Sequence, residues 1–320
     1  MIESEEFQFF MDNLINFITP PDGFCEKKAF IALGVFDGVH PGHQAVIQKA
    51  AARARELGIA AGAVTFVPHP KQILTPENPP QLLVSPEKRT ALLLEAGADF
   101  VASINFTPEV AAWEPEFFLE RLFDNPAFQI VGISVGATWK FGRRGAGDRQ
   151  LLSSFARKKN VSFSPVEELR RNGVTVSSTL IRQLLARGEI RQAADIWQQP
   201  VTLEGVVVTG IHAASTELAA PTANIIPDSG LLIPDGVYAG VAGLPEGDFP
   251  AVINVGSAPT YKISRRRIEV HLIGFSGDIY GKILKTELSA RLRDIRKFDS
   301  PAQLREQIKE DIANALLIAK

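Results

Sequence analysis

The chain has 320 residues, of which 45% are apolar and 22% are charged, a composition typical of a globular protein long enough for two domains. Its net charge of −2 gives no electrostatic basis for a nucleic-acid partner. No segment reaches the roughly 18 consecutive apolar residues of a membrane span, so we expect no membrane partner. The acidic start, Met1–Glu6, is unlike a signal peptide, and the single cysteine, Cys25, excludes an internal disulfide. We therefore expect a cytoplasmic protein.

The segment Gly34–His43 lies between an apolar run at 29–33 and a helix-forming run at 44–57. This order predicts a strand, a glycine-rich turn and a helix. Its glycines let a ligand approach the backbone, and the start of the helix offers N–H groups to an anion. His40 and His43 are placed to reach a phosphate there. The alternatives are a capping histidine and a metal site, and only His69 lies near enough in sequence to be a third ligand.

Apolar, strand-like runs alternate with helical patterns up to about residue 197. The strand-like runs lie at 59–67, 100–104 and 130–135, and the helical patterns lie at 86–96 and 115–122. This alternation predicts an α/β domain with a doubly wound parallel sheet.

Three further motifs of the first half suit phosphate chemistry. His69 follows a strand-like run, and open α/β sheets hold ligands at the carboxyl ends of their strands, although a turn histidine is the alternative. Ser178 and Thr179 begin a helical pattern that their hydroxyls can cap, and Arg182 lies about one turn later. A plain cap with a surface arginine is the other interpretation. The basic, glycine-rich loop at 140–149 is either a phosphate-covering loop or a solvated one.

After Pro200 the pattern changes to short β-type runs separated by Gly, Pro and Asp, which predicts an antiparallel barrel. The runs lie at 201–209, 236–242, 251–255, 268–273 and 283–288. An amphipathic helix is predicted at 301–318, with Leu304, Ile308, Ile312 and Leu316 on its apolar face. We place the domain boundary between residues 198 and 199.

These motifs together resemble the prokaryotic bifunctional riboflavin kinase/FMN adenylyltransferase (FAD synthetase) family. The resemblance covers nearly the whole chain and follows the family's order. In the first half it rests on Gly34–His43, Thr65–Pro70, Phe141–Asp148 and Ser178–Arg182. In the second half it rests on Pro221–Asn224, Asp235–Gly240, Asn254–Gly256, Pro259–Thr260, Glu269–His271, Tyr280–Gly281 and Lys297–Phe298.

For residues 1–198 the resemblance implies a Rossmann-like nucleotidyltransferase domain that makes FAD from FMN and ATP. His40 and His43 would bind the ATP phosphates and stabilise charge on the reacting phosphorus, while Arg182 would hold the triphosphate together with Ser178 and Thr179. Mg²⁺ would neutralise the leaving pyrophosphate. The residues implied to line the nucleotide site are Gly34, Phe36, Asp37, Gly38 and His69.

For residues 199–320 the resemblance implies a riboflavin kinase-like β-barrel with a terminal helix. Thr222 and Asn224 would help to hold Mg²⁺ and ATP, and Glu269 would take the proton from the ribityl 5′-hydroxyl of riboflavin. The residues alone favour another interpretation, in which Glu269 is an exposed strand carboxylate beside the arginines at 265–267. The implied small molecules are ATP, FMN, FAD and riboflavin; the oligomeric state does not follow from the sequence.

The chain departs from the family pattern mostly in its second half. In the loop that usually binds phosphate in the family, two glycines and an arginine are replaced by other residues. An arginine and a glutamate of the family pattern are also absent farther along the chain. The departures are Ser215, Thr216, Ala219, Ala258 and Ile295, with Thr138 the corresponding change in the first half. Three hypotheses follow: an enzyme with both activities, an adenylyltransferase with an inactive kinase barrel, and a flavin- or nucleotide-binding protein without turnover.

Overall fold

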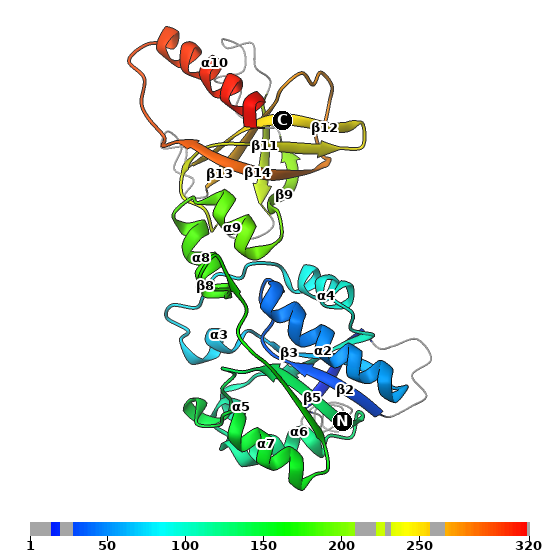
Figure 1. Ribbon diagram of the computed structural model, residues 1–320. Coiled ribbons are helices and arrows are strands. Elements are labelled where there is room, and N and C mark those ends of the chain that lie inside the picture. The colour runs from blue at the N-terminus through cyan, green and yellow to red at the C-terminus, as the bar shows by residue number, and fades with distance from the viewer. Residues whose placement is uncertain (1–13, 20–27, 209–221, 228–231, 257–265, 319–320) are drawn as a thin grey trace, which may run out of the picture. The chain divides into compact units, whose positions relative to one another are not determined.

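The computed structural model describes residues 14–19, 28–208, 222–227, 232–256 and 266–318 (Figure 1). The positions Ser215, Thr216, Ala219 and Ala258 lie outside this described part. The chain divides into two compact units, Met1–Ser178 and Thr179–Lys320. The expected domain boundary at residue 198 stays a prediction.

The first unit is built on a six-stranded sheet in the order β1-β4-β3-β2-β5-β6. Strands β2 to β6 are parallel, which confirms the predicted parallel sheet. The sequence patterns revealed neither β6 nor the antiparallel edge strand β1. The strands are β1 (Ile15–Thr19), β2 (Lys28–Leu33), β3 (Ala60–Val67), β4 (Phe100–Asn105), β5 (Gln129–Gly136) and β6 (Ser162–Val166), with a separate hairpin of β7 (Arg170–Arg171) and β8 (Val174–Thr175). The helices are α2 (Pro41–Leu57), α3 (Pro70–Leu74), α4 (Pro86–Glu95), α5 (Pro108–Ala112), α6 (Pro115–Phe123), η1 (Arg143–Gly145) and α7 (Arg149–Lys158).

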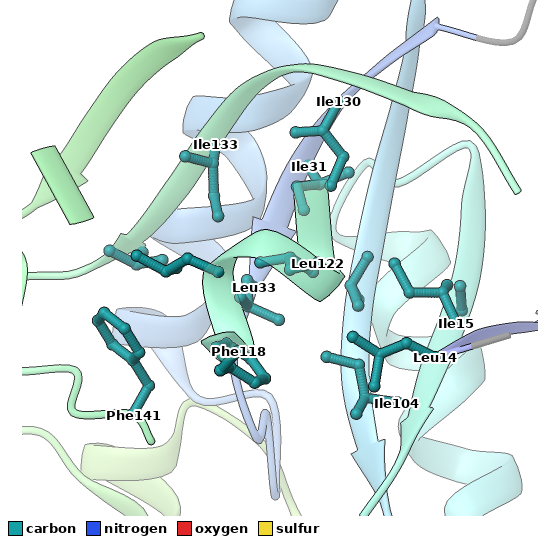
Figure 2. Close-up of a cluster of buried hydrophobic side chains, with 14 of the residues drawn as sticks. Leu14, Ile15, Ile31, Leu33, Ile104, Phe118, Leu122, Ile130, Ile133 and Phe141 are labelled. Atoms are coloured by element: carbon teal, nitrogen blue, oxygen red, sulfur yellow. The ribbon is translucent and has the colours of Figure 1, made fainter. Parts of the chain in front are cut away.

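Helices cover both faces of this sheet, because neighbouring strand residues point to opposite faces. On one face, Ile47 of α2 and Leu93 of α4 pack against Phe30 of β2. On the other face, Phe118 and Leu122 of α6 belong to a cluster with Ile31 and Leu33, which Figure 2 shows. The predicted doubly wound arrangement is therefore confirmed.

The order of the strands reverses at β2. From β2 the chain moves outward through β3 to β4, and it then returns to β5 on the other side of β2. Ligands of open α/β sheets bind at such a switch point, outside the carboxyl ends of the strands. The turn that follows β2 stands at this place (Figure 1).

The second unit is a closed barrel in the order β10-β13-β12-β11-β14-β9, in which all neighbouring strands are antiparallel. This confirms the predicted barrel. Its elements are α8 (Ser178–Ala186), α9 (Ile190–Trp197), β9 (Val201–Val208), β10 (Ala223–Pro227), β11 (Gly236–Leu244), β12 (Gly247–Gly256), β13 (Arg267–Leu272), β14 (Ile283–Arg293) and α10 (Pro301–Ile318).

The terminal helix α10 packs against β11, β12 and β14. Its predicted apolar face is partly wrong, because Leu316 is 40% exposed, whereas the buried residues are Gln307, Asp311 and Ala315. The physical reason is an ion pair: the guanidinium of Arg293, at the end of β14, donates to the Asp311 carboxylate and turns a polar stripe of the helix toward the barrel.

Candidate active site

The turn after β2 carries a pair of histidines at the first turn of α2. His40 is the N-cap of α2, and its Nδ1 accepts a hydrogen bond from the backbone N–H of His43 at 3.3 Å. The two imidazole rings are stacked, with their centroids 3.7 Å apart, and the Phe36 ring meets His43 edge-on at 5.4 Å. Because Nδ1 of His40 accepts, the neutral His40 ring carries its proton on Nε2, which makes that atom a donor.

The three glycines of the turn have different physical roles. Only Gly38, with φ of +79°, uses a backbone conformation that favours glycine. A Cβ on Gly34 would lie 2.8 Å from the Phe36 ring, and a Cβ on Gly42 would lie 3.2 Å from the His40 ring. Gly34 and Gly42 therefore make room for the aromatic rings of the turn itself.

Asp37 and Ser178 fix the turn from within the first unit. Asp37 is only 2% exposed, and its two carboxylate oxygens accept from the backbone N–H of Leu83 at 3.1 and 3.2 Å. The hydroxyl of Ser178 donates to the backbone carbonyl of Asp37 at 2.9 Å. This hydrogen bond joins two residues of the first unit that lie 141 positions apart in sequence.

His69 lies at the carboxyl end of β3, as predicted, where it is the N-cap of α3 and is 9% exposed. Its Nδ1 accepts from the backbone N–H of Lys71 at 3.1 Å. Thr179 and Arg182 belong to the second unit, where Thr179 is exposed and Arg182 is partly buried. Their place in one site with the histidines stays a prediction. Thr138 is exposed just after β5.

The barrel brings three polar residues into one row across neighbouring strands. Asn224 of β10 pairs in register with Glu269 of β13, and Glu269 pairs in register with Asn254 of β12. The side-chain amide of Asn254 donates to the Glu269 carboxylate at 3.3 Å. Thr222 immediately precedes β10 and is partly buried. Pairing thus places Asn224 beside the carboxylate that the family resemblance implies to be the base.

Oxygen atoms dominate this row, which suits Mg²⁺. The Oδ1 atom of Asn254 is buried and makes no hydrogen bond. Within the described ranges, no group of three or more His, Cys, Asp and Glu side chains could hold a metal ion. Mg²⁺ commonly binds through one or two protein oxygens together with substrate phosphates, so the donor set fits an ion that arrives with ATP.

Sequence reasoning missed Asn254 and Arg89. Asn254 lay in a motif that carried the family resemblance, but no role was attached to it. Arg89, on α4, is buried beneath the histidine turn. Its position in a helix with exposed charged neighbours gave no signal of burial.

Two family models divide the chain between them. One described as FAD synthetase matches residues 24–180, and one described as riboflavin kinase matches residues 197–319. The bifunctional riboflavin kinase/FMN adenylyltransferase of Bacillus subtilis (strain 168) is 31% identical over 301 residues, covering 91% of this chain and 92% of the relative. The protein of the same description from Escherichia coli (strain K12) is 30% identical, covering 89% of this chain and 91% of the relative.

A solved structure described as a macrolide-efflux protein from Streptococcus pneumoniae also matches, with a TM-score of 0.81 and 28% identity. The match covers 92% of this chain and 95% of the streptococcal chain. Across the residues that the structure describes, no helix has the length and apolar character to cross a membrane.

Proposed function

Because the chain belongs to the family of bifunctional riboflavin kinase/FMN adenylyltransferases, we propose that its first unit joins AMP from ATP to FMN and its second unit phosphorylates riboflavin. The observation that carries this proposal is the stacked pair His40 and His43 at the start of α2, at the sheet's switch point. An N-terminal helix end, ring N–H donors and a close-approach turn together suit a polyphosphate.

In the first reaction, a phosphate oxygen of FMN attacks the α-phosphorus of ATP. The new P–O bond joins FMN to AMP as FAD, and the bond to the β-phosphate oxygen breaks, so pyrophosphate leaves with that electron pair. Negative charge builds on the oxygens of the α-phosphorus, where His40 and His43 donate hydrogen bonds. No covalent intermediate with the protein forms, so the protein contributes positioning and charge stabilisation.

The remaining residues of the first reaction act on binding. Arg182 would hold the triphosphate together with the hydroxyl of Thr179. Ser178 keeps the turn in place through Asp37. Mg²⁺, when bound, supplies charge neutralisation to the phosphates. Gly34, Gly38 and His69 lie at the carboxyl ends of β2 and β3, where the nucleotide binds.

In the second reaction, Glu269 takes the proton of the ribityl 5′-hydroxyl of riboflavin. The hydroxyl oxygen attacks the γ-phosphorus of ATP, and ADP leaves. Thr222 and Asn224 would hold Mg²⁺ and the nucleotide. Support comes from the register of β10, β13 and β12, which sets Asn224 and Asn254 on either side of Glu269. Both reactions use small molecules only, and we place the enzyme in the cytoplasm without a nucleic-acid or membrane partner.

A second candidate is an adenylyltransferase whose barrel phosphorylates riboflavin slowly or not at all. The observation that favours it is Ile295, which replaces a family glutamate and is 49% exposed beside Gly256. An apolar side chain cannot replace the carboxylate at this position. The third candidate is a binding protein without turnover. The histidine pair disfavours this candidate, because binding alone does not need charge stabilisation at the reacting phosphorus.

The test is a product assay on the purified chain with Mg²⁺-ATP and either riboflavin or FMN, with flavins separated by chromatography. We expect FAD from FMN, and FMN from riboflavin at a lower rate. Equal rates of the two reactions would refute the slow-barrel candidate. A folded chain that binds ATP and FMN but forms no FAD would refute adenylyl transfer and favour the binding protein.

A further inference from the structure

Arg89 is the only lysine or arginine that is buried in the described part of the chain, with 5% of its surface exposed. Its neighbours on α4, Glu87 and Lys88, are exposed. Burying a guanidinium is costly unless other groups compensate its charge and hydrogen-bonding capacity. The groups that surround Arg89 therefore indicate what the burial achieves.

The guanidinium links the turn after β2 to the carboxyl end of the neighbouring strand β3. Its Nη1 donates to the backbone carbonyl of Val35 at 3.3 Å, and its Nη2 donates to the carbonyl of Phe66 on β3 at 3.5 Å. The hydroxyl of Thr65 also donates to the Val35 carbonyl, at 2.9 Å. Val35 is the second residue after β2, so two donors from outside the turn fix the start of the histidine turn.

Asp37 is the charged partner of Arg89 within that turn. Burial lowers the pKa of the Arg89 guanidinium, while the charge of Asp37 acts in the opposite direction. An arginine remains protonated in proteins, so the Arg89 cation attracts the buried Asp37 carboxylate through Coulombic interaction. Without the cation, the negative charge of Asp37 would act more strongly on a triphosphate bound at this turn.

The turn needs such support because its backbone is strained. Phe36 and Val39 have φ values of +55° and +41°, a region that residues with a Cβ seldom adopt. Strained conformations persist only where surrounding contacts over-determine them. Because the Phe36 ring contacts His43, a relaxed turn would also displace the histidine pair.

We propose that Arg89 is a positioning residue for adenylyl transfer, which holds Val35 and Phe36 in place for the histidines and cancels the charge of Asp37 toward polyphosphate. This inference rests on the proposed reaction of the first unit. Arg89 makes two contributions: its guanidinium bridges the carbonyls of Val35 and Phe66, and its positive charge offsets the negative charge of Asp37.

Three variants distinguish these contributions from general destabilisation. Arg89→Lys keeps the charge but cannot span both carbonyls, so turnover should fall about tenfold with little change in KM for ATP. Arg89→Met fills the space without charge, so KM for ATP should rise about tenfold as well. Adding Asp37→Asn to Arg89→Met should bring KM back toward that of Arg89→Lys. The matched control is Lys88→Met, which should behave like the unmodified enzyme.

A second readout does not need turnover. Pyrophosphate is a product of adenylyl transfer alone, so its calorimetric binding reports on the first unit. Arg89→Met should weaken pyrophosphate binding about tenfold, and Asp37→Asn should partly restore it.

The outcomes are distinct. If both Arg89 variants lower only the melting temperature, and keep KM, turnover per folded molecule and pyrophosphate affinity, the proposal is overturned. If Arg89→Met fails to fold, the kinetics of Arg89→Lys test the proposal, which requires turnover to fall while KM for ATP changes little. If the unmodified enzyme forms no FAD, adenylyl transfer fails as the function, whereas weakened pyrophosphate binding in Arg89→Met still supports the role of Arg89.

Discussion

Replacing Asp311 with alanine should destabilise the barrel unit strongly. The Asp311 carboxylate on α10 accepts from Arg293 Nε at 3.0 and 3.2 Å, from Arg293 Nη2 at 2.8 Å and from Gln307 Nε2 at 2.9 Å. Its side chain is 4% exposed, and that of Arg293 is 19% exposed. The alanine variant therefore leaves a mostly buried guanidinium without its carboxylate.

The expected magnitude follows from this geometry. Breaking a buried ion pair by removing one partner costs about 3 to 5 kcal/mol. Arg293 keeps some access to water, so we expect the lower end, about 3 kcal/mol. Replacing both partners with apolar residues, Arg293→Met with Asp311→Leu, should recover much of the loss because no charge is left buried.

The assay is urea denaturation, combined with hydrogen exchange of the α10 and β14 amides to localise the effect to the barrel unit. Glu306→Ala is the matched control, since Glu306 is an acidic residue of the same helix whose ion pair with Lys309 is exposed. It should change the free energy of unfolding by less than about 0.5 kcal/mol. An Asp311→Ala variant as stable as this control would refute the reasoning.

Three further predictions concern binding, pH and the kinase. Arg182→Ala should raise KM for ATP in FAD formation and lower turnover. An unchanged KM would show that Arg182 does not bind ATP. Burial raises the pKa of the Tyr238 hydroxyl, so its stabilising effect should be present below about pH 10 and be lost as pH rises through the higher folded-state value. Tyr238→Phe should remove this alkaline loss in denaturation series, and an identical alkaline loss would contradict it. Restoring the family residues with Ser215→Gly, Thr216→Arg and Ala219→Gly should raise the rate of riboflavin phosphorylation, and no increase would show that the loop is not the main defect.

Local patterns were enough to predict most elements of the fold. The strand, turn and helix around residues 29–57 followed from an apolar run, glycines and a helix-forming stretch, all of which act over short sequence distances. The edge strand β1 was missed because Ile15–Thr19 is defined by its pairing with β4, far along the chain. Hydrophobic periodicity also misplaced the buried face of α10, since it cannot foresee that Arg293 attracts Asp311 inward.

The sequence indicated where several candidate site residues lie in the fold, but not the contacts that they make. The histidine pair and His69 lie at carboxyl ends of parallel strands, where the motifs put them. The hydroxyl of Ser178 was expected to cap its own helix, and its donation to the carbonyl of Asp37 was not foreseen. Arg89 gave no signal at all, because a cation on an amphipathic helix usually faces water. Such contacts join segments that only the folded chain brings together.

The central claim is that the histidine pair stabilises the transition state of adenylyl transfer, and FAD formation by His43→Ala tests it most directly. The account predicts that turnover with FMN and ATP falls about 100-fold or more while KM for ATP changes much less, because the charge on the α-phosphorus develops only in the transition state. Lys49→Ala, an exposed change on the same helix, should leave both values unaltered. FAD formation by His43→Ala at the rate of the unmodified enzyme would contradict the claim.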